Sequence, residues 1–304
     1  MKVNLILMVL GLFCLPVFSA KANQQQLLPA AEGSYFGQTT PGMTPKVFAA
    51  DIVSIEGRYE YGVAFSPTMD EIYFSAQWPD ATADIYYSTV ESKHWQPINI
   101  ANFTKGQKAG EMEPFVSYDG QQIYFTAYNA DFTDTKIWIV NREATGWGKA
   151  HKLISPINDR EVFNATLARN GDLFYTDIFK SVTSVARREK GQYVDPNNVN
   201  IAFGIHGFIS PNQDYLLVDA QHNDDDDRKD SDIYVYFKQA NGDWSEPISL
   251  GPVVNSSYSE TVPTVTPDGK YLFFSRYDEQ GGISNLYWVS SQVIELVRPI
   301  TSEY

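Results

Sequence analysis

Residues 259–275 read SETVPTVTPDGKYLFFS, which is the pattern of two β-strands joined by a tight turn. Apolar side chains alternate at Val262 and Val265, the turn follows at Pro267-Asp268-Gly269, and a second apolar run occupies residues 271–274. Proline presets the backbone angle that a turn needs, and glycine accepts a positive φ at no steric cost. The stretch therefore predicts an antiparallel strand pair.

The same strand–turn–strand pattern occurs four more times along the chain. The expected inner strands are residues 60–65, 111–116, 162–167, 204–209 and 260–265. A third strand follows in each repeat, and in three repeats a turn with a tryptophan precedes a fourth. Four short strands in a repeated unit of this length are typical of a β-propeller. The residues that open the strand-joining turns are Ser66, Ser117, Ala168, Ser210 and Thr266.

The fifth repeat lacks the tryptophan turn and the usual fourth strand. A strand-like segment, residues 46–53, precedes the first repeat and has no partner of its own. If this segment supplies the missing strand, the ring closes without an exposed edge. We therefore predict an all-β fold with a single propeller of five four-stranded blades, the last closed by the N-terminal strand. A six-bladed alternative needs three more strands before residue 44, where the sequence is rich in Gln, Gly and Pro.

The first 22 residues have the features of a signal peptide. Lys2 is followed by an apolar run over residues 5–18 and by the small-residue cleavage motif Ala20-Lys21-Ala22. The alternative, a transmembrane anchor, needs about 20 apolar residues. We expect residues 23–44 to form an irregular arm, residues 45–304 the propeller, and the mature protein to be periplasmic or secreted with no membrane span. The single cysteine, Cys14, lies in the removed segment, which leaves no thiol for disulfides, metal or nucleophilic attack.

Three motifs carry a resemblance to a known family. They are the turn of residues 266–270, the aspartates that begin third strands at Asp84 and Asp232, and the Gly-Asp-Trp-Ser-Glu-Pro run at 242–247. Over residues 45–299 the chain resembles the bacterial WD40-like (PD40) β-propeller repeats of the TolB-like group. The resemblance implies a propeller fold and export. It implies no activity, because these motif residues build turns and blade packing.

The formal net charge of −14 argues against a nucleic-acid partner. A protein that binds nucleic acid presents a basic patch to the phosphates, and this sequence has no cluster of Lys and Arg. Four consecutive aspartates offer the hard oxygen ligands that calcium prefers, although the EF-hand spacing is absent and a solvated loop is the alternative. No other cofactor is expected. The candidate calcium ligands are Asp224, Asp225, Asp226 and Asp227.

Strand order locates a candidate binding site. In an antiparallel blade, the start of strand one, the end of strand two and the start of strand three lie at the same end. We expect that end to be the mouth of the central channel. Asn164 and His206 occupy positions equivalent to Glu113 in their repeats. The candidate ligand-binding residues are Glu60, Glu111, Glu113, Asn164, His206, Glu260, Arg276, Trp78 and Tyr128, and the mouth loops also contain Gln77 and Tyr277.

Two functions fit this arrangement. The leading hypothesis is an exported, non-catalytic propeller that binds a small molecule, carbohydrate or protein at a glutamate-lined mouth. The alternative is a carbohydrate-active enzyme, like a five-bladed glycosidase, with paired glutamates as acid and base. The sequence lacks the first-blade aspartate motif of those glycosidases. The glutamates have a structural interpretation as well, in which they cap backbone amides or pair with Arg160 and Arg276.

Overall fold

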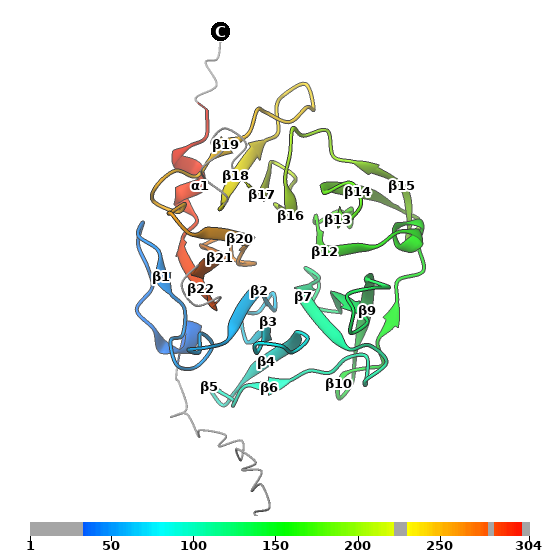
Figure 1. The fold of residues 1–304 in the computed structure, drawn as a ribbon, viewed down its shortest axis with the longest axis vertical. Helices are drawn as coiled ribbons and strands as arrows, with labels where there is room; N and C mark the ends of the chain where they lie inside the picture. Colours follow the sequence, from blue (N-terminus) through cyan, green and yellow to red (C-terminus); the bar gives the residue numbers. More distant parts are fainter. Residues whose placement is uncertain (1–32, 222–229, 279–282, 300–304) are drawn as a thin grey trace, which may run out of the picture.

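The computed structural model describes residues 33–221, 230–278 and 283–299. Five small antiparallel sheets are arranged as a ring, with one strand of each sheet nearest the centre (Figure 1). The predicted all-β, five-bladed propeller is confirmed. Blades are numbered here from 1 to 5 in chain order of their inner strands.

Each blade is a meander of neighbouring strands. The inner strands are β2 (Tyr59–Phe65), β7 (Gly110–Val116), β12 (Val162–Leu167), β16 (Ile205–Ile209) and β20 (Ser259–Val265). The second strands are β3 (Glu71–Gln77), β8 (Gln122–Tyr128), β13 (Leu173–Asp177), β17 (Tyr215–Gln221) and β21 (Tyr271–Asp278). The third strands are β4 (Asp84–Glu91), β9 (Lys136–Glu143), β14 (Val182–Glu189), β18 (Ser231–Phe237) and β22 (Ile283–Ser290).

The outer edges of blades 1 to 4 are short two-residue strands, except for the longer strand of blade 3. They consist of β5 (His94–Trp95) and β6 (Asn99–Ile100), β10 (Gly146–Trp147) and β11 (His151–Lys152), β15 (Gln192–Asn198), and β19 (Ile248–Ser249). The helical segments are η1 (Ser34–Gly37), η2 (Pro156–Asp159) and α1 (Gln292–Leu296). Within the described residues, none of these helices has the length and apolar character needed to cross a membrane.

The N-terminal strand closes the ring as the sequence predicted. Strand β1 (Lys46–Val47) pairs antiparallel with β22, and the next backbone amide, that of Phe48, donates to Leu286 O at 2.7 Å. The first and last strands, β1 and β22, therefore meet in blade 5 (Figure 1). The strand is shorter than the expected 46–53 because Ala49 has a φ of 45°, and the chain turns back there as Val53 N bonds Ala49 O at 2.7 Å.

The described end of the N-terminal arm is packed against the seam between blades 5 and 1. Tyr35 and Phe36 are buried, and the Phe36 ring stacks on Trp95 with centroids 4.5 Å apart. Trp95 Nε1 also donates to Gly33 O at 3.0 Å. Residues expected to be an irregular arm thus add aromatic contacts to the ring closure.

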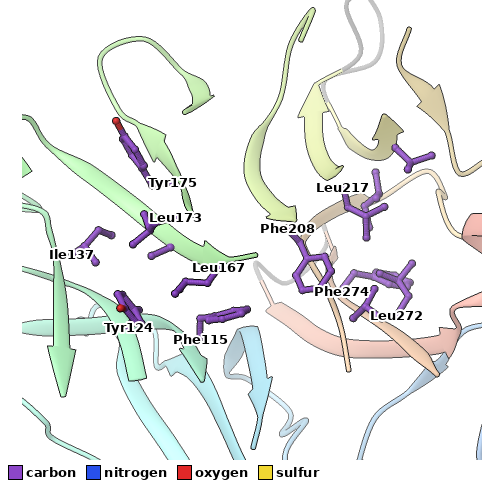
Figure 2. Packing of buried hydrophobic residues seen from close by; sticks show 14 of the residues in the cluster. Phe115, Tyr124, Ile137, Leu167, Leu173, Tyr175, Phe208, Leu217, Leu272 and Phe274 are labelled. Carbon is purple, nitrogen blue, oxygen red and sulfur yellow. The ribbon is translucent and has the colours of Figure 1, made fainter. Parts of the chain in front are cut away.

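Apolar side chains from neighbouring blades form the core. Figure 2 shows Phe115 and Tyr124 of blade 2 beside Leu167 and Leu173 of blade 3, all within one buried cluster. In four of the five blades, a hydroxyl that opens the strand-joining turn bonds to groups within its own turn. Thr266 Oγ1, for example, donates to Asp268 Oδ1 at 2.6 Å and accepts from Tyr271 N at 3.2 Å. The turn motif is therefore structural.

Candidate functional site

Every inner strand contains a β-bulge at the same position. The register shifts once in each inner pair, and the residue at the shift adopts a positive φ of about 50°. Such a φ is uncommon for residues other than glycine, and a bulge redirects the side chain at that point. We call these residues the bulge ring. They are Gly62, Glu113, Asn164, His206 and Val262.

Hydrogen bonds between blades hold the bulge ring. In four blades, the backbone amide of the bulge residue donates to a side-chain oxygen on the second strand of the preceding blade. The bonds are Glu113 N to Ser75 Oγ (2.7 Å), Asn164 N to Thr126 Oγ1 (3.1 Å), His206 N to Thr176 Oγ1 (3.0 Å) and Val262 N to Asp219 Oδ1 (2.9 Å). Three of the acceptors are hydroxyls, and Asp219 is the exception.

Two carboxylates of this region flank one imidazole. His206 Nδ1 lies 2.8 Å from Asp219 Oδ1, and His206 Nε2 lies 3.4 Å from Glu113 Oε1. Burial alone would lower the pKa of His206, but the Asp219 and Glu113 carboxylates outweigh it and raise the pKa to about 10. His206 is therefore an imidazolium at neutral pH. Because both ring nitrogens face carboxylates, neither is available as a general base or a metal ligand.

Glu111 and Glu260 hold the loops that precede their strands. Both Glu111 oxygens accept backbone bonds, from Phe103 N at 2.9 Å and Thr104 N at 2.7 Å. Glu260 accepts from Ser256 N at 3.0 Å and pairs with Arg276 Nε at 2.7 Å. These buried contacts match the structural interpretation of the two glutamates and of Arg276. Arg160, the other expected partner of a glutamate, pairs with Asp177 instead.

Glu60 is fully buried and only partly paired. Its Oε1 accepts from Arg58 Nε at 2.6 Å and from Ile55 N at 3.3 Å, while Oε2 has no hydrogen-bond partner among the described residues. Burial raises the pKa of Glu60 to about 7, against the opposing pull of Arg58 and the Ile55 amide. An unpaired buried carboxylate oxygen costs free energy, so Glu60 is a partly unsatisfied polar group in the protein interior.

The mouth has a cavity of about 480 Å³ between blades 1 and 5, which we call the mouth pocket. Tyr59, Trp78 and Tyr277 contribute aromatic rings, and Gln77 contributes an amide. The Tyr59 and Tyr277 centroids are 5.9 Å apart in an edge-to-face arrangement, and Trp78 is 48% exposed. The guanidinium of Arg58 lies 6.0 Å from the Trp78 ring. Gly57, Pro79 and Asp80 complete the lining.

Tyr59 connects the mouth pocket with the charged residues of the channel. Burial, followed by the Asp219 and Glu113 carboxylates and Tyr277, raises the pKa of Tyr59 to about 12. Its ring centroid is 4.9 Å from that of Tyr61, which belongs to a buried apolar cluster. The hydroxyl of Tyr59 is therefore a neutral hydrogen-bonding group at neutral pH.

Tyr128 and Asn164 face inward rather than into the mouth pocket. The Tyr128 hydroxyl accepts from Ala83 N at 3.0 Å, and its ring occupies the space that a side chain at Gly110 would fill. Asn164 Nδ2 donates to Gly207 O at 3.4 Å. Asp224, Asp225, Asp226 and Asp227 lie outside the described residues. In the part that is described, no group of three or more His, Cys, Asp or Glu side chains is arranged to hold a metal ion.

Sequence reasoning brought Trp78, Gln77 and Tyr277 to the mouth but missed Tyr59 and Asp219. Asp219 could have been found by aligning the second strands of the five repeats. It occupies the position that is a hydroxyl residue in the other four, namely Ser75, Thr126, Thr176 and Ser275. Tyr59 gives no comparable signal, because it precedes its strand's conspicuous Glu60 by one residue.

The fold and the site together define a five-bladed β-propeller with an aromatic pocket at one end and a charged bulge ring in its channel. No protein-family model and no curated protein matches the sequence. Among solved structures, a GH43 endo-arabinanase from Bacillus licheniformis has 12% identity and a TM-score of 0.52, covering 77% of this chain and 94% of that one. A putative TolB from Agrobacterium tumefaciens has 14% identity and a TM-score of 0.49, covering 73% and 71%. At such identities the likeness concerns the fold alone.

Proposed function

We propose that this propeller is a non-catalytic binding protein that takes a carbohydrate in the mouth pocket. The observation that carries the proposal is the convergence of Tyr59, Trp78 and Tyr277 with the Gln77 amide in one cavity. Ligand sites are concave and combine an apolar lining with a few placed polar groups. A sugar ring presents an apolar face of C–H bonds and a rim of hydroxyls, which matches both parts of the lining.

Each pocket residue has a distinct part in this proposal. Exposed Trp78 stacks on the sugar ring, and the Tyr59 hydroxyl and Gln77 amide bind sugar hydroxyls. The Arg58 guanidinium beside Trp78 disfavours a cationic ligand at this ring. Glu113, Asn164 and His206 form the polar channel beneath the pocket. In this account Glu60, Glu111, Glu260, Arg276 and Tyr128 keep the mouth in shape rather than contact the ligand.

Glycoside hydrolysis fits the geometry less well than binding. The reaction uses one carboxylic acid and one separate carboxylate on either side of the scissile bond. Glu60, Glu111 and Glu260 are engaged with arginines or backbone amides. Glu113 and Asp219 share the His206 imidazolium between them, and Asp219 also accepts from Val262 N. Binding without turnover therefore agrees better with these contacts.

The proposal includes export: we expect the protein to bind its carbohydrate in the periplasm or outside the cell. Residues 1–22, the proposed signal peptide, lie outside the described residues. Sequencing the N-terminus of the protein recovered from periplasmic or culture fractions tests this part. A mature chain beginning near residue 23 is expected, and an intact Met1 in a cytoplasmic fraction would contradict it.

Calorimetric titration with a panel of neutral mono- and oligosaccharides tests the binding. The wild type should bind at least one of them, and Trp78→Ala should weaken that binding about tenfold because a stacking surface is lost. Phe179→Ala is the matched control: Phe179 is an aromatic residue, 77% exposed, on a mouth-side loop of blade 3 and outside the pocket. No binding by the wild type, or an equal loss in both variants, would refute the proposal.

A further inference from the structure

A second cavity, of about 590 Å³, lies at the opposite end of the propeller. We call it the turn-face pocket, because the strand-joining turns of several blades line it. Pro67 comes from blade 1, Tyr118 from blade 2, Arg169 from blade 3 and Pro267 from blade 5. Arg188, on the third strand of blade 3, completes its basic side. The proposed carbohydrate site makes no use of this cavity.

The two arginines of this pocket differ from the other arginines of the described chain. Six described arginines form ion pairs: Arg58 with Glu60, Arg142 with Glu71, Arg160 with Asp177, Arg187 with Glu189 and Asp195, Arg276 with Glu260, and Arg298 with Glu295 and Asp214. In the described ranges, Arg169 and Arg188 are the two with no carboxylate partner, and both line the turn-face pocket. In a chain with 37 acidic and 23 basic residues, two unpaired cations in one cavity call for an explanation.

The surrounding residues hold Arg188 in place. Its aliphatic part packs on Gly171, where a Cβ would lie only 2.8 Å from Arg188 Cδ. Its Nη1 donates to the hydroxyls of Tyr193 at 3.0 Å and Tyr124 at 3.3 Å. A guanidinium has five N–H donors. The donors on Nε and Nη2 have no hydrogen-bond partner within the described residues. This edge of the guanidinium is therefore free to bind a ligand.

Arg169 is anchored through its backbone, while its guanidinium has no hydrogen bond or ion pair within the described residues. Its amide donates to Pro211 O at 2.8 Å, and its guanidinium lies 5.9 Å from the centre of the Tyr118 ring. Asp119 also lines the cavity, and its own turn, together with the Arg188 charge, holds the pKa of this carboxyl below its usual value, although it forms no ion pair with either arginine within the described residues. Asp119 Oδ1 accepts from Ser117 Oγ at 2.6 Å and from Gln121 N at 3.0 Å, within its own turn.

We infer that the turn-face pocket binds the oxyanion group of a small organic molecule, a carboxylate or a phosphate. The planar guanidinium fork matches the geometry of both groups, and charge-assisted bonds to them are the strongest that arginine makes. The tyrosine hydroxyls and the flat faces of Pro67 and Pro267 supply surface for the rest of the molecule. The volume lies in the range of small-molecule sites.

Calorimetric titration with citrate and with inorganic phosphate, at constant ionic strength, tests the inference. Wild type should bind at least one probe, and the preferred probe identifies the source of the oxyanion. Arg169→Ala and Arg188→Ala should each weaken binding about tenfold, since each removes charged hydrogen bonds. Arg188→Lys keeps the charge but loses the fork, so we expect an intermediate loss.

Arg187→Ala is the matched control. It removes the same charge from the neighbouring position, but Arg187 pairs with Glu189 at 3.0 Å and with Asp195 outside the cavity. The affinity of Arg187→Ala for the preferred anion should stay within about twofold of that of the wild type. Binding of neither probe by the wild type, or an equal loss in Arg187→Ala and Arg188→Ala, would overturn the inference. Trp78→Ala should leave anion binding unchanged, which separates this site from the mouth pocket.

Discussion

In four blades, a single hydroxyl makes two or more of the side-chain hydrogen bonds of the strand-joining turn. At Thr266 the hydroxyl donates to Asp268 and accepts from two backbone amides, and Ser66, Ser117 and Ser210 make similar bonds in their blades. Blade 3 has Ala168 at this position and uses Asn170 with Asp172 N instead. The sequence pattern revealed the turns because proline, aspartate and glycine mark them. Because blade 3 forms its turn with Ala168, the hydroxyl is not essential for the turn to form.

Thr266→Ala should lower the free energy of unfolding by about 1–2 kcal/mol, because its hydroxyl bonds to Tyr271 N, Lys270 N and Asp268 are lost. Urea denaturation measures the change. Thr82→Ala is a suitable control, since its exposed hydroxyl donates to a single carbonyl, Ala109 O. An unfolding free energy equal to that of wild type would contradict the structural reading of the turn.

The pKa of His206 makes stability depend on pH. Its folded-state pKa of about 10 exceeds the usual 6.5, so its stabilising contribution is fully present below pH 6.5 and is lost as pH rises through 10. The groups facing it are Asp219, Glu113 and the ring of Phe163. The pKa of Glu60 is about 7, so Glu60 titrates below most of the pH range from 6.5 to 10 in which the His206 contribution is lost.

Unfolding free energy should therefore fall between about pH 7.5 and 10 in the wild type and fall less in His206→Gln. Urea titrations at the two pH values measure both slopes. The His206 ring protons in an NMR titration should also remain those of an imidazolium through about pH 9. An ordinary titration near pH 6.5, or equal slopes in the two proteins, would show that the carboxylates do not hold the proton.

At the scale of elements, the closure of blade 5 was predictable from a missing strand, but the extent of β1 was not. The sequence of residues 46–53 alternates like a strand, and nothing in it marks the positive φ that Ala49 adopts. The bulge ring was predictable in part. Equivalent positions of Glu113, Asn164 and His206 followed from the repeat alignment, whereas the bonds between blades depend on how neighbouring sheets face each other.

Phe48 ties this closing segment to blade 5. The side chain is fully buried, with ring centroids 4.9 Å from Phe273 and 5.3 Å from Trp288. Phe48→Ala should lower the unfolding free energy by about 3–5 kcal/mol, from lost burial and a cavity. Ile154→Ala, at a site that is 97% exposed, should have little effect. Similar unfolding midpoints for the two variants would mean that β1 does not close the ring.

Across the whole molecule, the two ends of the propeller differ in chemistry. The mouth combines aromatic rings with buried, engaged carboxylates, and the turn face combines unpaired arginines with tyrosine hydroxyls. A propeller fold can serve many functions, so the pockets rather than the ring must identify the ligands. Strand order in the sequence predicted which side chains share one end of the ring, but it emphasised the glutamates there, because charge is visible in a sequence and the bonds that engage that charge are not.

The most direct test compares a pocket aromatic with a mouth glutamate. Calorimetric titration of Tyr277→Ala and Glu111→Gln uses the sugar that wild type binds best. Tyr277→Ala should weaken binding about tenfold. Glu111→Gln should lose about 1–3 kcal/mol of stability through its bonds to the 103–104 loop, with its affinity near that of wild type. Unchanged affinity in Tyr277→Ala together with lost binding in a folded Glu111→Gln would contradict the aromatic mouth pocket as the binding site.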